Sequence, residues 1–86
     1  MAYGVAVAPS ARKQLRRLPH AAQGRILDAM EALGTYPRPR GAVKLEASLH
    51  LYRVRVGDYR IIHSIIDSSV LVLKIGHRSD VYRDRI

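Results

Sequence analysis

Arginine side chains concentrate in one short segment of the chain, which reads LYRVRVGDYRIIHSII. The pair Gly57-Asp58 predicts a two-residue hairpin loop, which places Arg55 directly opposite Arg60. Strand side chains alternate between two faces, so Arg53 shares the face of Arg55 and Arg60. Like charges placed opposite each other destabilise a sheet, so folding alone gives no reason to gather them. Binding of a phosphate gives a reason to gather arginines, because a planar guanidinium binds a phosphate through two hydrogen bonds.

The next strand, VLVLKIG, extends this basic face. A two-residue loop before it would bury Lys74, so we expect a three-residue loop at 67–69. Lys74 and Gly76 then share the arginine face, and Gly76 lies opposite Arg60, where no side chain blocks a close backbone approach. In this register the residues that turn toward the core are Leu71, Leu73 and Ile75. The pattern therefore predicts a basic cleft floored by strands.

The tail GHRSDVYRDRI follows the last strand and places His77, Arg78 and Tyr82 near one end of the basic face. Cleavage of RNA by its own 2′-hydroxyl needs a proton acceptor, a proton donor for the departing 5′-oxygen, and cations beside the phosphorus. Tyr82, His77 and the arginines supply these groups. The alternatives are a packing role for Tyr82, a surface position for His77 and a merely solvated sheet face for the arginines.

Metal and cofactor chemistry find no support in the residue pattern. The four histidines lack the paired spacing of a zinc site, and the chain has no cysteine, so we expect neither a metal nor a cofactor. His63 falls on the expected core face and is interpreted as a buried, hydrogen-bonded residue. A glycine-rich phosphate loop, a carboxylate pair and a serine triad are also missing from the sequence.

The composition describes a basic chain of 86 residues, interpreted as one domain over residues 1–86. Fifteen Lys and Arg against seven Asp and Glu give a formal net charge of +8, which indicates nucleic acid, an anionic membrane or an acidic protein as partner. The start of the chain lacks a secretory signal, and no apolar run approaches the roughly 18–20 residues that span a bilayer. We therefore expect a cytoplasmic protein that does not associate with a membrane.

The apolar spacing predicts two helices before the basic strands. A first strand around Tyr3–Val7 precedes a helix that starts at Pro9 with Ser10 as a possible N-cap, and a second helix runs from His20 to about Leu33. The loop TYPRPRG carries Arg38 and Arg40, and strands follow at 51–56, 59–66 and 70–76. We expect an α+β fold with two N-terminal helices packed on one face of a four-stranded, mainly antiparallel sheet, in the order β-α-α-β-β-β.

The segments YRVRVGDYR and GHRSDVYR resemble the RelE toxins of bacterial toxin–antitoxin modules, within the RelE/ParE superfamily, and SARKQLRRLP is similar too. The resemblance covers nearly the whole chain. It implies a small ribonuclease, working without a metal, that enters the ribosomal A site and cuts the mRNA there. A cognate antitoxin silences such toxins, so the resemblance implies a monomer that forms a hetero-oligomer with its antitoxin.

Carried over by position, the resemblance assigns roles to individual residues. Arg60 matches an arginine that contacts the scissile phosphate, Arg78 one that stabilises or protonates the leaving group, and Tyr82 the tyrosine near the C-terminus. Arg53 and Arg55 stand where the best-known members carry lysines, and since arginine keeps its proton, neither is a general base. The base is then Tyr82, His77 or no strong base at all. The further candidates for RNA contact are Arg53, Arg55, Lys74, Arg38 and Arg40.

The expected function is therefore a ribosome-dependent endoribonuclease that inhibits translation, with ribosome, mRNA and antitoxin as partners. It would drive attack of the mRNA 2′-oxygen on the adjacent phosphate and leave a 2′,3′-cyclic phosphate. Two alternatives stay open. One is a ParE-like toxin that inhibits gyrase, and the other is a non-catalytic module that binds RNA or an acidic protein.

Overall fold

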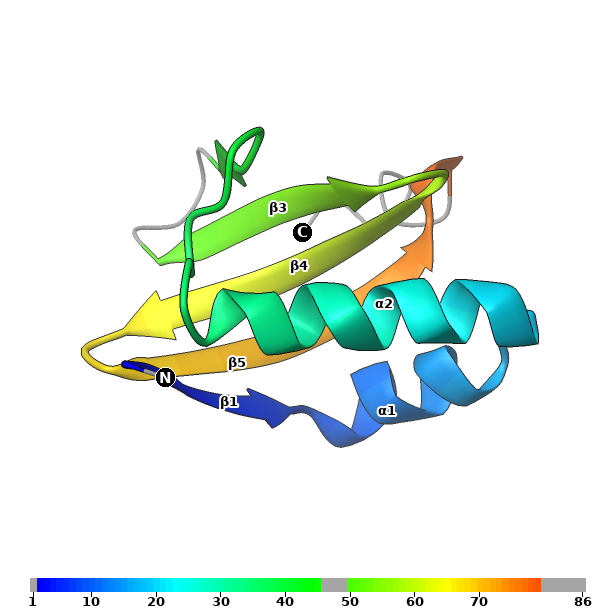
Figure 1. Cartoon of the computed structure of the whole chain (residues 1–86), viewed down its shortest axis with the longest axis horizontal. Coiled ribbons are helices and arrows are strands. Elements are labelled where there is room, and N and C mark those ends of the chain that lie inside the picture. The colour runs from blue at the N-terminus through cyan, green and yellow to red at the C-terminus, as the bar shows by residue number, and fades with distance from the viewer. Residues whose placement is uncertain (1, 46–49, 80–86) are drawn as a thin grey trace.

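The computed structural model describes residues 2–45 and 50–79. Both helices lie on the same face of a single sheet, which confirms the expected α+β architecture (Figure 1). None of the helices in these two ranges is long and apolar enough to cross a bilayer. In chain order the elements are β1 (Gly4–Val7), α1 (Pro9–Arg16), α2 (His20–Leu33), β2 (Val43–Lys44), β3 (Leu51–Val56), β4 (Tyr59–Ile66) and β5 (Ser69–His77).

The sheet has five strands rather than the expected four, in the order β1-β5-β4-β3-β2. The additional strand, β2, is only two residues long and pairs with β3 at the sheet edge, where Val43 lies opposite Arg53. The segment that contains it, VKLEASLH, alternates only irregularly, so the sequence did not define it as a separate strand. At the other edge, β1 runs parallel to β5, and the remaining pairs are antiparallel. This pairing supplies the position of the first strand, which the sequence pattern left open.

The β3–β4 hairpin has the predicted register. Arg55 lies opposite Arg60, and Arg53 lies opposite Ile62. Gly57 is the first of the two turn residues and has a φ of 61°. This is the position where a type II′ hairpin turn requires glycine, because other residues meet steric strain at positive φ.

The predicted β4–β5 register is correct at one end and wrong at the other. Next to the loop, Ile66 pairs with Ser69, so the loop holds two residues and not three. Leu71 consequently faces away from the helices and is 36% exposed, whereas Val70 and Val72 are buried. A β-bulge at Ile62/His63 shifts the pairing.

Beyond this bulge the predicted pairs return, with Lys74 opposite Ile62, Ile75 opposite Ile61, and Gly76 opposite Arg60. Without a bulge, a two-residue loop would bury Lys74, and a three-residue loop would turn Val72 away from the core. A bulge places one extra residue on one strand, which reverses the alternation of side chains after it. Val72 and Ile75 can therefore both face the core while Lys74 faces away from it.

The core lies between the helices and the sheet. Its buried side chains come from both helices and from β3, β4 and β5: Ala11, Ile26, Met30, Leu33, Val54, Ile61, Ile65, Val70, Val72 and Ile75. Leu27 is 50% exposed, because it lies off the buried stripe of α2. One expectation for the helices was wrong. The N-cap of α1 is Ala8 rather than Ser10, because Pro9 already occupies the first helical turn.

Candidate functional site

Three arginine residues make hydrogen bonds to the turn between β3 and β4. Arg55 donates from Nε to the Gly57 carbonyl at 3.2 Å. Arg60 donates from Nη1 to the carbonyls of Tyr59 at 3.1 Å and Gly57 at 3.5 Å. The backbone N–H of Arg78, just beyond β5, donates to the Asp58 carbonyl at 2.9 Å. We call Arg55, Arg60 and Arg78 the turn cluster.

A fourth arginine approaches the same turn from the helical layer. A Cβ atom built on Gly57 would lie 3.4 Å from Nη1 of Arg25, a residue of α2. Glycine at this position therefore provides the positive φ of the turn, and the Arg25 guanidinium lies within contact distance of it. Arg25 was not predicted as a site residue, because no local sequence pattern connects a helix position with a turn so far along the chain.

Burial distinguishes Arg60 from the other members of the turn cluster. Arg60 is only 7% exposed, whereas Arg55 and Arg78 are exposed. Arginine stays charged in proteins, and a buried charge needs compensating hydrogen bonds, which the carbonyls of Tyr59 and Gly57 provide in part. These bonds fix the orientation of the Arg60 guanidinium before any ligand arrives.

The expected open floor of this face is only partly present. Ile62, next to Arg60 on β4, is 1% exposed although it points away from the helices, so the centre of this face is covered. Arg53 and Lys74 lie on either side of Ile62 and are half-buried. The predicted cleft therefore narrows to the end of the sheet at the β3–β4 turn, where the exposed arginines lie.

His77 is not brought together with the turn cluster. It pairs with Tyr59, and the two rings meet edge to face at 84° with centroids 5.9 Å apart. Tyr59 packs against the core on the helix side, so His77 lies on the opposite face of the sheet from Arg60. His77 therefore lies at the expected end of the sheet but not on the basic face, because the side chains of residues 76 and 77 alternate. Tyr82 lies outside the described residues.

Arg38 is also separated from the turn cluster. Its Nε donates to the Tyr52 hydroxyl at 3.1 Å, and its guanidinium lies 5.3 Å from the centroid of the Tyr52 ring. Tyr52 stacks on the buried ring of His63, on the helix side of the sheet. The hydroxyls of Tyr52 and Tyr3 raise the pKa of Arg38 by stabilising its charged form. Arg40 is exposed in the same loop.

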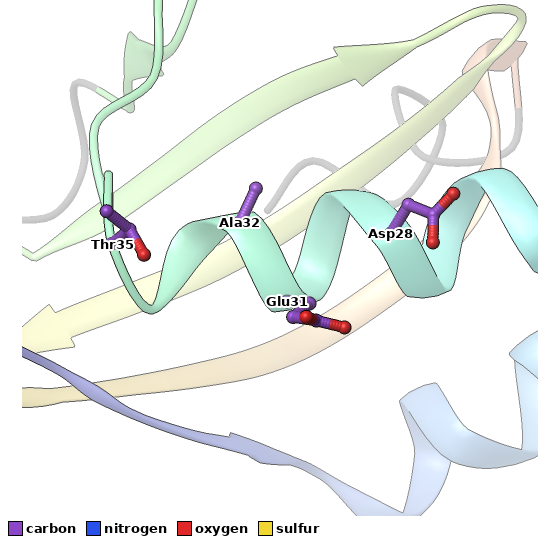
Figure 2. A pocket seen from close by; sticks show the side chains of 4 residues that line it. All are labelled: Asp28, Glu31, Ala32 and Thr35. Atoms are coloured by element: carbon purple, nitrogen blue, oxygen red, sulfur yellow. The ribbon is translucent and has the colours of Figure 1, made fainter. Parts of the chain in front are cut away.

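A shallow pocket lies on α2, away from the turn. Figure 2 shows the side chains that line it, Asp28, Glu31, Ala32 and Thr35. Its two carboxylates would repel a phosphate, so this pocket does not extend the candidate anion site. Among the described residues, no group of three or more His, Cys, Asp and Glu side chains has the geometry to hold a metal ion.

The turn cluster is suited to a phosphate. Carbonyl hydrogen bonds orient the guanidinium groups of Arg55 and Arg60 beside the same turn, and a planar guanidinium matches the geometry of a phosphate. Several such donors at one place stabilise the additional negative charge that a phosphate acquires during displacement at phosphorus.

Comparisons with known proteins identify the family. Residues 5–82 match the family model described as the ParE toxin of the type II toxin-antitoxin system, parDE. No protein with a curated description matches the sequence.

Solved structures of toxins share the fold. The chain is similar to the archaeal RelE-RelB complex from Pyrococcus horikoshii OT3, with 36% sequence identity, a TM-score of 0.80, and coverage of 91% of this chain and 97% of that one. It is also similar to the isolated E. coli RelE toxin, with 25% identity, a TM-score of 0.78, and coverage of 96% and 94%. It is also similar to the RelBE2 toxin-antitoxin complex from Mycobacterium tuberculosis, with 25% identity, a TM-score of 0.77, and coverage of 91% of this chain and 100% of that one. The chain therefore belongs to the RelE/ParE family of toxins from type II toxin–antitoxin modules.

Proposed function

We propose that this toxin is a ribosome-dependent endoribonuclease that cuts mRNA in the A site and acts in the cytoplasm. The observation that carries the proposal is the turn cluster, in which Arg55, Arg60 and Arg78 bond to the carbonyls of one two-residue turn. The similarity to RelE toxins, with 36% identity to the archaeal one, also supports the proposal.

The proposed reaction is an internal transesterification. The mRNA 2′-oxygen attacks the adjacent phosphorus and loses its proton, a P–O2′ bond forms, and the P–O5′ bond breaks as the 5′-oxygen gains a proton. The products are a 2′,3′-cyclic phosphate and a free 5′-hydroxyl. Arg60 would hold the phosphate, Arg55 would stabilise the charge that accumulates on its oxygens, and Arg78 would assist the leaving group.

The reaction relies on positioning and charge more than on a strong base. Arg53 and Arg55 keep their protons, so neither accepts one from the 2′-hydroxyl. His77 faces the other side of the sheet, which leaves Tyr82 as the proposed acceptor. The ribosome contributes the alignment of the mRNA, and well-aligned internal attack is greatly accelerated over the free reaction.

The proposed protein partner is a cognate antitoxin. Similar folds occur in complexes of toxin with antitoxin, among them the archaeal RelE-RelB complex and the M. tuberculosis RelBE2 complex. The net charge of +8 favours an acidic partner.

The test uses ribosomes stalled with an empty A site, mixed with the purified toxin. We expect new mRNA 3′ ends within the A-site codon that carry a 2′,3′-cyclic phosphate. Arg78→Ala should lose this cleavage, whereas Arg12→Ala, an exposed arginine of α1, should retain it. Equal cleavage by wild type and Arg78→Ala would reject the catalytic assignment.

A second candidate function is inhibition of DNA gyrase. The observation that favours it is the family model itself, which is described as a ParE toxin. Against it stands the combination of Arg60, Arg78 and Tyr82, which nuclease chemistry needs and gyrase inhibition does not. Loss of gyrase supercoiling on addition of the toxin, together with intact mRNA on stalled ribosomes, would favour this alternative.

A further inference from the structure

The loop between α2 and β2 presents an aromatic ring and two arginines to solvent. In its sequence, Tyr36-Pro37-Arg38-Pro39-Arg40, the prolines turn inward, Pro37 being buried and Pro39 half-buried, and the other three side chains are exposed. Tyr36 is 68% exposed, more than the other large apolar or aromatic side chains that lie exposed in the described part of the chain. Residues 34–41 contain no acidic side chain.

This loop is anchored to the domain at several backbone positions. The N–H of Tyr36 donates to the Ala32 carbonyl at 2.8 Å, and the Pro39 carbonyl accepts from the Ala42 N–H at 2.9 Å. The Pro37 carbonyl accepts from Nε2 of His63 at 2.8 Å, and this histidine is fully buried. Proline restricts both its own backbone and that of the preceding residue. The exposed side chains therefore project from a backbone that is already fixed.

The position of Arg38 is fixed as well. Its contacts with Tyr52, through Nε and across the ring face, hold one edge of the guanidinium. The remaining N–H donors of an exposed guanidinium are suited to a phosphate. The loop therefore carries a guanidinium in a fixed position, that of Arg38, and an exposed aromatic ring, that of Tyr36.

An aromatic ring beside fixed cations is the arrangement that binds single-stranded nucleic acid. Bases stack on exposed aromatic rings regardless of sequence, and adjacent basic side chains hold the backbone phosphates. An acidic protein would be attracted to Arg38 and Arg40 but would gain little from the exposed tyrosine ring that precedes them in the loop. The combination, together with a net charge of +8, favours RNA.

The loop and the turn cluster lie at opposite ends of β3 (Figure 1). Tyr52, which holds Arg38, is five residues before Gly57, a distance of about 16 Å along a strand. Arg38 also lies on the helix side of the sheet, opposite to Arg60. The loop therefore engages an RNA segment other than the scissile phosphate.

We propose that Tyr36, Arg38 and Arg40 form a second RNA-binding site, in which a base stacks on Tyr36 and Arg38 and Arg40 hold flanking phosphates. The inference rests on the proposed function for the identity of the ligand as RNA. It goes further by assigning this loop to a separate, non-cleaved segment.

The experiment measures binding of the full chain to a short, labelled single-stranded RNA by fluorescence anisotropy over a range of salt concentrations. Tyr36→Ala should weaken binding about tenfold with an unchanged salt dependence, because it removes stacking and no charge. Tyr36→Phe should bind like wild type. Arg38→Gln should weaken binding and lower the slope of log affinity against log salt by about 0.7, the value for one single-strand phosphate.

A crosslinking experiment with the same RNA carrying 5-bromouridine provides the second readout. Crosslinks to the peptide that contains Tyr36 support the site. Wild-type affinity in Tyr36→Ala together with no crosslink in residues 34–41 would overturn it. A loss in Arg38→Gln without one in Tyr36→Ala would also overturn it, since the loop would then act only as charge.

The cleavage assay on stalled ribosomes separates this inference from the proposed function. RNA binding that depends on Tyr36 without any mRNA cleavage by wild type would retain the second site and reject the nuclease. Cleavage by wild type combined with unchanged RNA binding in Tyr36→Ala and Arg38→Gln would retain the nuclease and reject the second site.

Discussion

The opposition of Arg55 and Arg60 predicts that removing one of these charges stabilises the fold. The two residues are paired across the β3–β4 hairpin, one pair away from the turn. In a two-residue hairpin the closing pair, here Val56 and Tyr59, is hydrogen-bonded, so the next pair belongs to the close, non-hydrogen-bonded type. Two positive side chains are thus held side by side, and Arg55→Gln removes one charge at nearly the same length.

The magnitude follows from the exposure of Arg55. Like charges directly opposite on a sheet cost about 0.2–1 kcal/mol, and because Arg55 is exposed, water screens the pair and about 0.5 kcal/mol is expected. The lost Arg55 hydrogen bond to the Gly57 carbonyl acts in the other direction. This term is small, because the bond is exposed at 3.2 Å and the glutamine amide can also donate. The melting temperature should therefore rise by about 2–4 °C in a domain of this size.

Differential scanning calorimetry of wild type and Arg55→Gln measures this shift. Arg12→Gln, which makes the same charge change on the exposed surface of α1, is the matched control. The difference between wild type and Arg55→Gln should shrink in 1 M salt, where the Debye length is about 3 Å. A melting temperature that falls, or that rises no more than in the control, would refute the idea that this pair strains the fold.

Three further predictions concern the fold around the site. Burial lowers the pKa of His63, so the unfolded chain takes up a proton more readily than the folded one. The free energy of unfolding should therefore fall as the pH drops below about 6.5, by up to about 1.4 kcal/mol for each unit by which the two pKa values differ. Urea titrations at several pH values measure this loss, which should be missing in His63→Phe. Gly57→Ala should cost about 1–2 kcal/mol in urea unfolding, because alanine is strained at a φ of 61°. Stability equal to wild type would contradict the turn geometry. Val72→Ala should destabilise the fold by about 2 kcal/mol, because Val72 is buried, and Leu71→Ala by less than about 0.5 kcal/mol, because Leu71 faces away from the core. Thermal unfolding measures both losses, and a larger loss for Leu71→Ala than for Val72→Ala would contradict the bulged register.

Local patterns were sufficient to predict the elements and the first hairpin. Both helices and the pairing of Arg55 with Arg60 follow from spacing and from one Gly-Asp turn, which are properties of neighbouring residues. The bulge between β4 and β5 was not predictable in this way. The bulge lets Val72 and Ile75 face the core while Lys74 faces away from it. This arrangement depends on the packing of three strands and the helices together. The short strand β2 likewise depends on an edge that β3 provides.

The candidate site was predicted in part. Arg55 and Arg60 were named from the hairpin, and Arg78 from its place after the last strand and from the family resemblance. His77 lies at the expected end of the sheet, but its pairing with Tyr59 turns it toward the helices. Arg38 was named as a candidate for RNA contact in a loop, and its contact with Tyr52 was not visible in the sequence. Residues that meet through tertiary packing, as Arg25 and Gly57 do, leave no periodic signal.

The most direct test of the turn cluster is the single-turnover rate of mRNA cleavage on stalled ribosomes for Arg60→Lys and Arg78→Ala. Lysine keeps the charge at position 60 but loses the planar, carbonyl-held donors, and a melting curve verifies that each variant is folded. We predict a rate at least about 100-fold below wild type for each variant, the loss that removal of one oriented donor causes in comparable sites. Folded variants that cleave at the wild-type rate would contradict the claim that arginines held at the Gly57-Asp58 turn stabilise the reacting phosphate.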